Sequence, residues 1–431
     1  MKIVGCAMVV LLVCAPGECR TAAAAGEAPD ALAPARAAPS EAPTGFDGRS
    51  NGFVDDATHA ADREVFDEVE DADGGLGPVY NAQACRECHQ SPVSGGPSQV
   101  TELRVGHLDR LGRFANPVIP LGDGSESIRD RSLVNDRTLC PSEAFPEIDA
   151  TSHVPRSETI RARRISLGVL GDGFVEAIPS RSLLALAADQ CRRSRGRICG
   201  QAVLVPVLEA GGSLRVGRFG WKAQHASLLS FSADAYLNEM GITSRLLPDE
   251  VATRCDAVDD PEDEPGPDGL ADIDRFARFM RALPAPAGDA AIAREPDAIA
   301  GLERFRAIGC ETCHVQTHVT APAGSVVNGG ALTVPEALGN QQIHPFSDFL
   351  LHDVGTGDGI VQNGGARTAQ KLRTPPLWGL RLRTRLMHDG DSLGSQAALL
   401  RHGGEAAGPV FRYLQLPREQ QRQLLRFLAS L

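Results

Sequence analysis

Two stretches of the chain share one frame, and they read Cys85-Arg86-Glu87-Cys88-His89 and Cys310-Glu311-Thr312-Cys313-His314. Cys-x-x-Cys-His is the attachment signature of c-type haem. The spacing places both thiols on one helical turn, where each can form a thioether to the porphyrin, and the adjacent imidazole can bind the iron. The sequence therefore predicts two covalently bound haem c groups, with His89 and His314 as iron ligands.

Two other uses of Cys-x-x-Cys fit less well. A zinc knuckle needs a second cysteine pair close by in the sequence, and neither motif has one. A thioredoxin-type dithiol lies in an alternating βαβ pattern, which neither neighbourhood has.

Composition narrows the class of protein further. The chain has 431 residues, a net charge of −12 and no Lys/Arg-rich run, which argues against a nucleic-acid-binding protein. Its apolar stretches are shorter than the roughly 20 residues that a membrane-spanning helix needs, so we expect no membrane span.

The N-terminus indicates export. Lys2 precedes an apolar stretch over 3–15, and small residues follow through Ala25, which is typical of a secretory signal; an uncleaved anchor is the alternative. We expect a signal peptide at 1–25, an Ala/Pro-rich flexible segment at 26–50 and a periplasmic or otherwise exported protein that is soluble after cleavage.

Four cysteines lie outside both motifs and the signal, namely Cys140, Cys191, Cys199 and Cys255. An even number in an exported protein predicts two disulfides, with free buried thiols as the alternative. The short loop between Cys191 and Cys199 favours that pair and leaves Cys140 for Cys255.

Apolar residues at helical spacing predict helices over 60–70, 182–191, 227–240, 273–283, 298–308 and 418–431. The Pro284-Ala285-Pro286 stretch and the Ala-rich residues after it mark a boundary between two domains. We expect an N-terminal haem domain with an insertion at 51–290 and a C-terminal cytochrome c-like haem domain at 297–431. The predicted fold class is mainly α, with two cytochrome c-like haem lobes, the first carrying a large loop-rich insertion.

Two further features bear on ligands. The acidic run 259–268 predicts a solvated loop, with a Ca²⁺-binding loop as the weaker alternative. The C-terminal domain carries three histidine clusters, around His352, His388 and His402, and one of these should supply the sixth ligand of the second iron.

Several short motifs lie between residue 45 and residue 431, namely 77–81 (GPVYN), 173–179 (GFVEAIP), 217–222 (GRFGWK), 239–243 (EMGIT), 348–353 (DFLLHD), 373–377 (RTPPL) and 388–390 (HDG). Together they resemble the bacterial di-haem c-type oxidoreductase family, which is related to the di-haem cytochrome c peroxidases. The resemblance implies two cytochrome c-type haems and a peroxidase-like activity.

The resemblance also implies an axial ligand. The peroxidases carry a methionine ligand fourteen residues after the His-Asp-Gly histidine, and here the fourteenth residue after His388 is His402. Histidine in place of methionine lowers the reduction potential of a haem. His402 is therefore the expected sixth ligand of the second iron, and His388 is expected to orient the site through hydrogen bonds.

A second part of the peroxidase pattern lies near the middle of the chain. Trp221 matches a tryptophan between the two haems, Phe231 stands where those enzymes have glutamine, and Glu239 matches their glutamate. Peroxide cleavage needs a base and an acid, so Glu239 is the expected proton-transfer group, with His225 as a second candidate. A distal ligand of the first iron stays open between His107 and His225.

The resulting hypothesis is an oxidoreductase in which the N-terminal haem reacts with substrate and the C-terminal haem passes electrons through Trp221. Its expected partners are a small redox substrate such as hydrogen peroxide and an electron-donor protein or cytochrome. Two alternatives remain open: a non-catalytic electron-transfer cytochrome, and a di-haem oxidase that modifies another protein.

Overall fold

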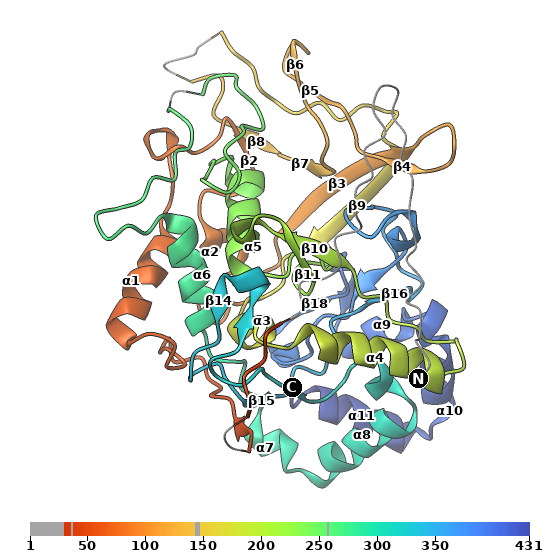
Figure 1. Ribbon diagram of the computed structural model, residues 1–431. Helices are drawn as coiled ribbons and strands as arrows, with labels where there is room; N and C mark the ends of the chain where they lie inside the picture. Colours follow the sequence, from red (N-terminus) through yellow and green to blue (C-terminus); the bar gives the residue numbers. More distant parts are fainter. Residues whose placement is uncertain (1–29, 36–37, 143–146, 257) are drawn as a thin grey trace, which may run out of the picture.

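The computed structural model describes residues 30–35, 38–142, 147–256 and 258–431 (Figure 1). The expected signal peptide therefore lies outside the described residues. None of the helices in the described part of the chain is both long and apolar enough to cross a membrane.

The helices include two that carry the cysteine motifs, and their order is α1 (Asp56–Asp67), η1 (Ala72–Gly74), α2 (Cys85–Cys88), α3 (Asp172–Glu176), α4 (Ser180–Arg193), η2 (Leu208–Ala210), α5 (Leu228–Ala235), η3 (Tyr236–Met240), α6 (Asp272–Ala282), α7 (Ala290–Ala293), α8 (Pro296–Ala307), η4 (Cys310–Thr312), η5 (Asn328–Gly330), η6 (Ala366–Thr368), η7 (Leu380–Leu382), α9 (Ser395–Leu400), η8 (Gly404–Ala406), α10 (Ala407–Gln415) and α11 (Arg418–Leu428).

The strands are mostly very short, and their order is β1 (Ser40–Glu41), β2 (Val79–Tyr80), β3 (Thr101–Leu108), β4 (Phe114–Ala115), β5 (Ile119–Leu121), β6 (Glu126–Ile128), β7 (Leu133–Val134), β8 (Arg137–Thr138), β9 (Ile160–Ile165), β10 (Leu204–Val207), β11 (Ser213–Val216), β12 (His318–Val319), β13 (Val326–Val327), β14 (Leu332–Thr333), β15 (Gln341–Ile343), β16 (Leu351–His352), β17 (Leu372–Arg373), β18 (Arg385–Leu386) and β19 (Ser392–Leu393).

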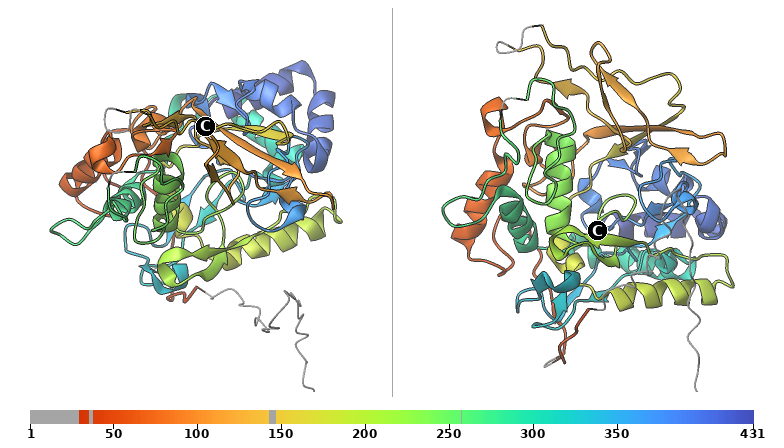
Figure 2. Two further views of the ribbon diagram at one scale, coloured as in Figure 1. Left: turned by 90° about the horizontal axis from the view of Figure 1, so that it is seen from above. Right: turned by 45° about the horizontal axis from the view of Figure 1, so that its top comes forward.

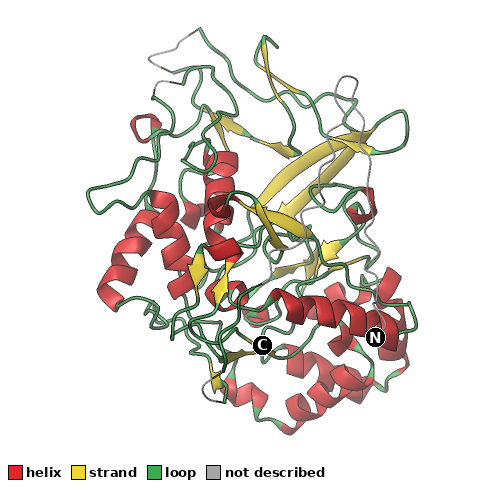
Figure 3. Cartoon of the chain, in the orientation of Figure 1, coloured by secondary structure: helices red, strands yellow, loops and turns green. Residues whose placement is uncertain are grey.

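The expected mainly α fold with two cytochrome c-like haem lobes is wrong. Helices make up 31% of the structure and strands 16%, and the strands form many small sheets joined by long loops (Figure 3). The region expected to be a loop-rich insertion contains the largest sheet, in which β3 pairs with β4, β7 and β9 (Figure 1).

The pairing of β3 with β9 explains why the sheet was missed. The two strands run antiparallel from Thr101 opposite Ile165 to Gly106 opposite Ile160. Glu102 and Arg104 alternate with apolar residues in β3, a pattern typical of a half-buried strand that the expectation of a loop-rich insertion overlooked. In β9 the adjacent Arg163 and Arg164 interrupt the alternation, and the distance between the two strands in the sequence hides their pairing.

The six predicted helices are confirmed, as α1, α4, α5 with η3, α6, α8 and α11. Local chemistry sets their ends. Asp55 caps α1 by accepting a hydrogen bond from Thr58 N, and Pro296 begins α8, where the missing N–H costs nothing.

Two of these helices, α8 and α11, pack against each other in the C-terminal part of the chain. Gly301 allows the close crossing, because a Cβ at that position would collide with the Gln423 carbonyl of α11. Phe305, Phe427 and Leu424 are buried in the cluster that this crossing forms. In every view α1 and α11 lie on opposite sides of the molecule (Figures 1 and 2).

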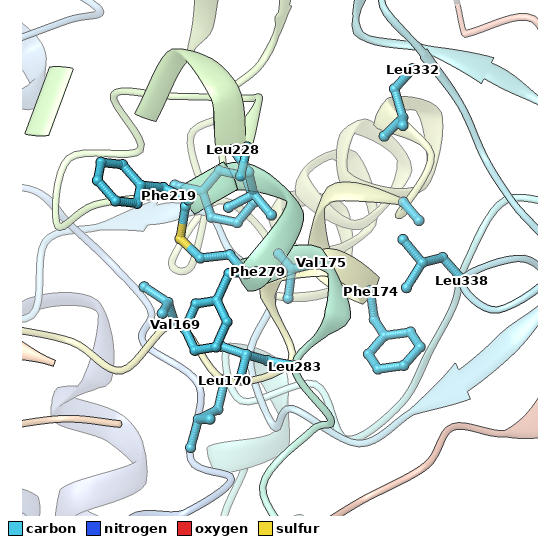
Figure 4. Packing of buried hydrophobic residues seen from close by; sticks show 14 of the residues in the cluster. Val169, Leu170, Phe174, Val175, Phe219, Leu228, Phe279, Leu283, Leu332 and Leu338 are labelled. Atoms are coloured by element: carbon cyan, nitrogen blue, oxygen red, sulfur yellow. The ribbon is translucent and has the colours of Figure 1, made fainter. Parts of the chain in front are cut away.

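The larger core gathers side chains from widely separated segments. Phe174 and Val175 of α3 pack with Phe279 of α6 and with Leu338 from the C-terminal half (Figure 4). Near the start of the described chain, Ser40 of β1 pairs with Gln341 of β15. The two halves are thus interleaved, and the domain bounds 51–290 and 297–431 stay a prediction.

Both favoured disulfides are confirmed. Cys191 pairs with Cys199 at the end of α4, and Cys140 pairs with Cys255 beside the strands of the β3 region. The remaining described cysteines, Cys85, Cys88, Cys310 and Cys313, form no disulfide.

Candidate redox centres

The C-terminal Cys-x-x-Cys-His segment opens into a cavity with largely apolar walls. Gly309, with a positive φ, turns the chain from α8 into η4, and this turn sets Cys310 and Cys313 at the cavity wall. Burial raises the pKa of the Cys310 thiol to about 12. His314 is also in the wall, and burial lowers its pKa to about 4, so the ring is neutral and able to bind a metal.

His402 lies across this cavity from His314. The two ring centres are 6.4 Å apart. Two imidazoles bound to opposite sides of one metal ion, each through a bond of about 2 Å, would have ring centres about 6 Å apart. The spacing therefore fits one iron between the two rings.

The second ring nitrogens support the same arrangement. His314 Nδ1 lies 3.0 Å from the Phe346 carbonyl oxygen, and His402 Nδ1 lies 2.8 Å from that of Ala398. Metal-binding histidines characteristically donate their other N–H to such an acceptor, which fixes the ring. Nε2 of each ring is left to bind a metal.

Among the polar atoms of this cavity, Arg383 Nε and His388 Nδ1 are buried and have no hydrogen-bond partner among the described residues. Burial lowers the pKa of Arg383 to about 10. Arg383 Nη2 donates a hydrogen bond of 2.8 Å to the Pro376 carbonyl oxygen, and the buried Nε–H is left for a ligand that brings anionic groups, as the propionates of haem do. The residues present thus fit a haem.

The other two histidines near this site have different surroundings. His352 has a carboxylate at each ring nitrogen, Asp348 at 2.8 Å and Glu405 at 2.9 Å. His388 packs edge-on to Trp221, with ring centres 6.2 Å apart. The hydrogen-bonding role expected for the His388 side chain stays a prediction.

The N-terminal Cys-x-x-Cys-His segment is the short helix α2. Burial raises the pKa of the Cys88 thiol to about 12, with a further contribution from the nearby charge of Glu239. Burial lowers the pKa of His89 to about 4, and its ring lies beside Phe66, with centres 6.3 Å apart. His89 is therefore a neutral imidazole that can bind iron.

Carboxyl groups gather near this second segment. Glu239 lies on η3, a π-helical turn that continues α5, and such turns often re-aim functional side chains. Its Oε2 accepts a hydrogen bond of 2.9 Å from Asn81 Nδ2. Burial, with the facing charge of Glu102, raises the pKa of Glu239 to about 8, so Glu239 holds a proton at neutral pH.

Glu102, on β3, is the nearest charged partner of Glu239. Burial would raise its pKa, but Arg104 forms a two-point ion pair with Glu102 at 2.5 and 3.0 Å and holds that pKa below its usual value. The two glutamates share a hydrogen bond. One is ionised and the other is protonated, so the pair offers a base and an acid together.

The two histidines considered as distal ligands have carboxylate partners. His225 Nε2 lies 3.0 Å from Asp234 Oδ2, and the same aspartate accepts a hydrogen bond from Asn238, the residue before Glu239. His107, on β3, has Nδ1 2.8 Å from Glu158 Oε2 and is partly exposed. Ligation by either stays a prediction.

One chain segment links the two centres. Ser166 Oγ donates a hydrogen bond of 2.6 Å to the Cys88 carbonyl oxygen, and Ser166 also lines the cavity of the C-terminal centre. Its neighbour Ile165 accepts a hydrogen bond of 2.8 Å from Trp221 Nε1. Trp221 is buried and lines the same cavity, so it lies beside the segment that joins the centres.

The acidic run predicted as a loop contributes to a third group. Glu250, Asp260 and Glu262 have carboxylate oxygens within 4.8 Å of one another. Thr243 Oγ1 lies 3.0 Å from Asp260 Oδ1 and also close to Glu262 Oε2, so its one proton can be donated to either carboxylate. Oxygen-rich clusters of this kind suit Ca²⁺.

Sequence reasoning missed Glu102, Arg104, Ser166 and Arg383, and it missed both carboxylates that flank His352. Glu102, Ser166 and Glu405 meet their partners only across long stretches of the chain, where no spacing rule applies, whereas Arg104 and Asp348 lie two and four residues from theirs. The charged residues alternating in β3 were the only available signal for Glu102.

No curated protein matches the chain. Two solved structures are distantly similar: the diheme peroxidase BthA from Burkholderia thailandensis E264, at 16% identity over 94% of each chain and a TM-score of 0.41, and Kuenenia stuttgartiensis hydrazine synthase, at 12% identity over 91% of this chain and 90% of that chain, with a TM-score of 0.36. Likeness this distant carries no argument here.

A family model gives the clearest result. The model described as "Di-haem oxidoreductase, putative peroxidase" matches residues 140–431, which is more than half of the chain. The match includes the C-terminal centre, Trp221 and Glu239, and the family name implies two haems. The chain belongs to the di-haem oxidoreductase family.

Proposed function

We propose that this chain is an exported di-haem c-type cytochrome with peroxidase-like activity, in which the N-terminal haem reacts with peroxide and the C-terminal haem passes electrons. The observation that carries the proposal is the contrast between the centres. One has two histidines 6.4 Å apart across an apolar cavity, whereas the other has an acid–base pair of glutamates near its cysteines.

In this proposal Cys310 and Cys313 hold the C-terminal haem by thioethers, and His314 and His402 bind its iron. Carbonyls at both Nδ1 atoms orient the rings, and Arg383 offers a cation for an anionic group of the haem. An iron held by His314 and His402 would exchange electrons at a low potential, because histidine in place of methionine lowers the potential of a haem.

Cys85, Cys88 and His89 hold the N-terminal haem, whose iron supplies the site at which peroxide is reduced. Near it, the ionised Glu102 can take a proton while the protonated Glu239 gives one to the leaving oxygen. Asn81 and Arg104 fix the two carboxyl groups through their hydrogen bonds. After the reaction the two glutamates together carry one proton, as they did before it.

Trp221 carries electrons between the centres in this proposal. Its hydrogen bond to Ile165 and its place in the wall of the C-terminal cavity support that role. Ser166 then connects the same segment to the Cys88 carbonyl.

The proposal extends to processing and to a structural ion. Residues 1–25 are removed as a signal peptide, the segment 26–50 leads into the haem domains 51–290 and 297–431, and Ca²⁺ binds at Glu250, Asp260 and Glu262. Glu250 Oε1 supports the ion site, because it is buried and receives no hydrogen bond from the described residues. The melting temperature should rise with added CaCl₂ in the wild type but not in Glu250→Gln, and equal responses would contradict the site.

One spectrum tests the main proposal. The ferric protein, matured in a host that attaches haem c, should show a low-spin component that hydrogen peroxide leaves in place and a second component that peroxide changes. A spectrum that peroxide leaves unaltered in both the ferric and the half-reduced protein would instead favour a non-catalytic electron-transfer cytochrome.

A further inference from the structure

A buried charge cluster lies directly behind the C-terminal cysteine pair. His352 is 1% exposed, and its Nδ1 lies 3.9 Å from Cys313 Sγ. Its Nε2 lies 2.8 Å from Asp348 Oδ2, and Nδ1 lies 2.9 Å from Glu405 Oε2. His352 and Glu405 also line the cavity that contains His314 and His402.

The geometry fixes the charge of this cluster. Each ring nitrogen of His352 faces a carboxylate, so both must carry a proton and the ring is an imidazolium. One cation between two anions leaves a net negative charge beside the haem site. A buried charge in such a place acts strongly on the iron, because the surroundings screen it poorly.

The Cys191–Cys199 disulfide closes a loop over the same cluster. Gln190, the residue before Cys191, donates a hydrogen bond of 2.6 Å to Asp348 Oδ2 and one of 2.7 Å to the Thr312 carbonyl. The backbone N–H of Cys199 donates to Glu405 Oε2 at 2.8 Å. Each end of the disulfide loop therefore supplies a donor to one of the two carboxylates.

We infer that the Asp348–His352–Glu405 cluster sets the reduction potential of the C-terminal haem, and that the Cys191–Cys199 disulfide holds the cluster in place. The inference rests on the proposed function only in needing a haem between His314 and His402. His352 is a positioning and charge-setting residue that binds no iron. Charge and hydrogen bonding near a haem are established means of tuning its potential.

The sign of the charge provides the test. His352→Gln removes a positive charge, so the ferric form gains stability and the midpoint potential of the C-terminal haem should fall. Glu405→Gln removes a negative charge, and the same potential should rise. For each variant we expect about a tenfold change in the reduced-to-oxidised ratio at fixed potential, or about 59 mV. Spectroelectrochemical titration of the low-spin haem measures it.

Shifts of the midpoint potential in opposite directions distinguish this role from a merely structural one. A structural role would shift the potential in the same direction in both variants, or would only reduce the haem content. If His352→Gln fails to fold, the potential of Glu405→Gln still tests the inference. The Glu405 side chain is partly exposed, and glutamine has the same shape as glutamate. A potential within error of wild type in Glu405→Gln would overturn the inference.

The second disulfide offers a matched control. Cys191→Ser/Cys199→Ser frees the donors on both carboxylates, so the potential should fall, by less than in His352→Gln. Cys140→Ser/Cys255→Ser removes a disulfide that packs with the β3 region instead, and should leave the potential unchanged. Equal potentials in the two double variants would overturn the role of the disulfide. Absence of any low-spin haem in the wild type would contradict the proposed function itself.

Discussion

The two Cys-x-x-Cys-His segments have the same frame but different surroundings. Around the C-terminal segment, apolar side chains form a cavity with a second neutral histidine facing His314. Around the N-terminal segment, two glutamates share a proton close to Cys88. The motif predicts attachment of the cofactor, whereas residues brought from distant parts of the chain give each segment its own surroundings.

The largest expected effect is on cofactor content. Wild-type protein from a maturation-competent host should exceed the polypeptide mass by two haems under denaturing conditions. Cys85→Ala/Cys88→Ala and Cys310→Ala/Cys313→Ala should each lose one haem, because each removes both thioether positions of one centre. Mass spectrometry checks this, and an unmodified wild-type mass would contradict both centres.

A variant of the acid–base pair should affect the reaction at the N-terminal centre and leave the C-terminal centre unchanged. Glu239→Gln keeps the size of the side chain and removes its ionisable proton, so peroxide-driven oxidation should slow by roughly 10²-fold. Haem content should stay at the wild-type level. Glu87→Gln, which changes a half-buried glutamate of the α2 turn, serves as the control. Equal rates in the two variants would remove Glu239 from the reaction.

The C-terminal centre should respond in its spin state instead. His402→Ala should convert its haem from low-spin to high-spin, because one axial position opens, and His402→Met should raise its potential. Electron paramagnetic resonance and potentiometry measure these changes. An unchanged spectrum in His402→Ala, together with a changed one in His388→Ala, would assign the ligand to His388.

The pH dependence sharpens the contrast. Glu239 has a raised pKa of about 8, so its protonated form predominates below that pH and is lost as pH rises through it. The rate of peroxide-driven oxidation should therefore decline above pH 8 in the wild type. Glu239→Gln should lack this decline, and persistence of the decline in that variant would assign it to another group.

The smallest effect concerns the link between the centres. Trp221→Phe removes the hydrogen bond to Ile165 but keeps an aromatic ring in the cavity wall. We expect the first reaction with peroxide to keep its rate and the following oxidation of the C-terminal haem to slow severalfold. Rapid-mixing spectroscopy separates the two phases, and unchanged second-phase kinetics would exclude Trp221 from the route.

The features that sequence predicted well are local ones. Helical periodicity predicted α1, α4, α5, α6, α8 and α11, and the short loop between Cys191 and Cys199 predicted their pairing. The family resemblance pointed to His402 through its spacing from His388, and the structure brings its ring across from His314, while its binding of iron stays a prediction.

The features that sequence could not predict depend on long-range contacts. The mainly α assignment failed because β3 is completed by β9 and many other strands are two residues long. Glu102 approaches Glu239, and Glu405 approaches His352, only after the chain has folded. Charged side chains in these positions look like exposed residues in the sequence, and burial together with the neighbouring charges sets their protonation states.

The central claim is that peroxide reacts at the N-terminal haem while the C-terminal haem supplies electrons. Rapid mixing of hydrogen peroxide with the wild type, Cys85→Ala/Cys88→Ala and Cys310→Ala/Cys313→Ala tests it most directly. The account predicts a fast spectral change in the wild type and in the variant that keeps only the N-terminal haem, and none in the variant that keeps only the C-terminal haem. A fast change that survives the loss of Cys85 and Cys88, or no change in any redox form of the wild type, would contradict it.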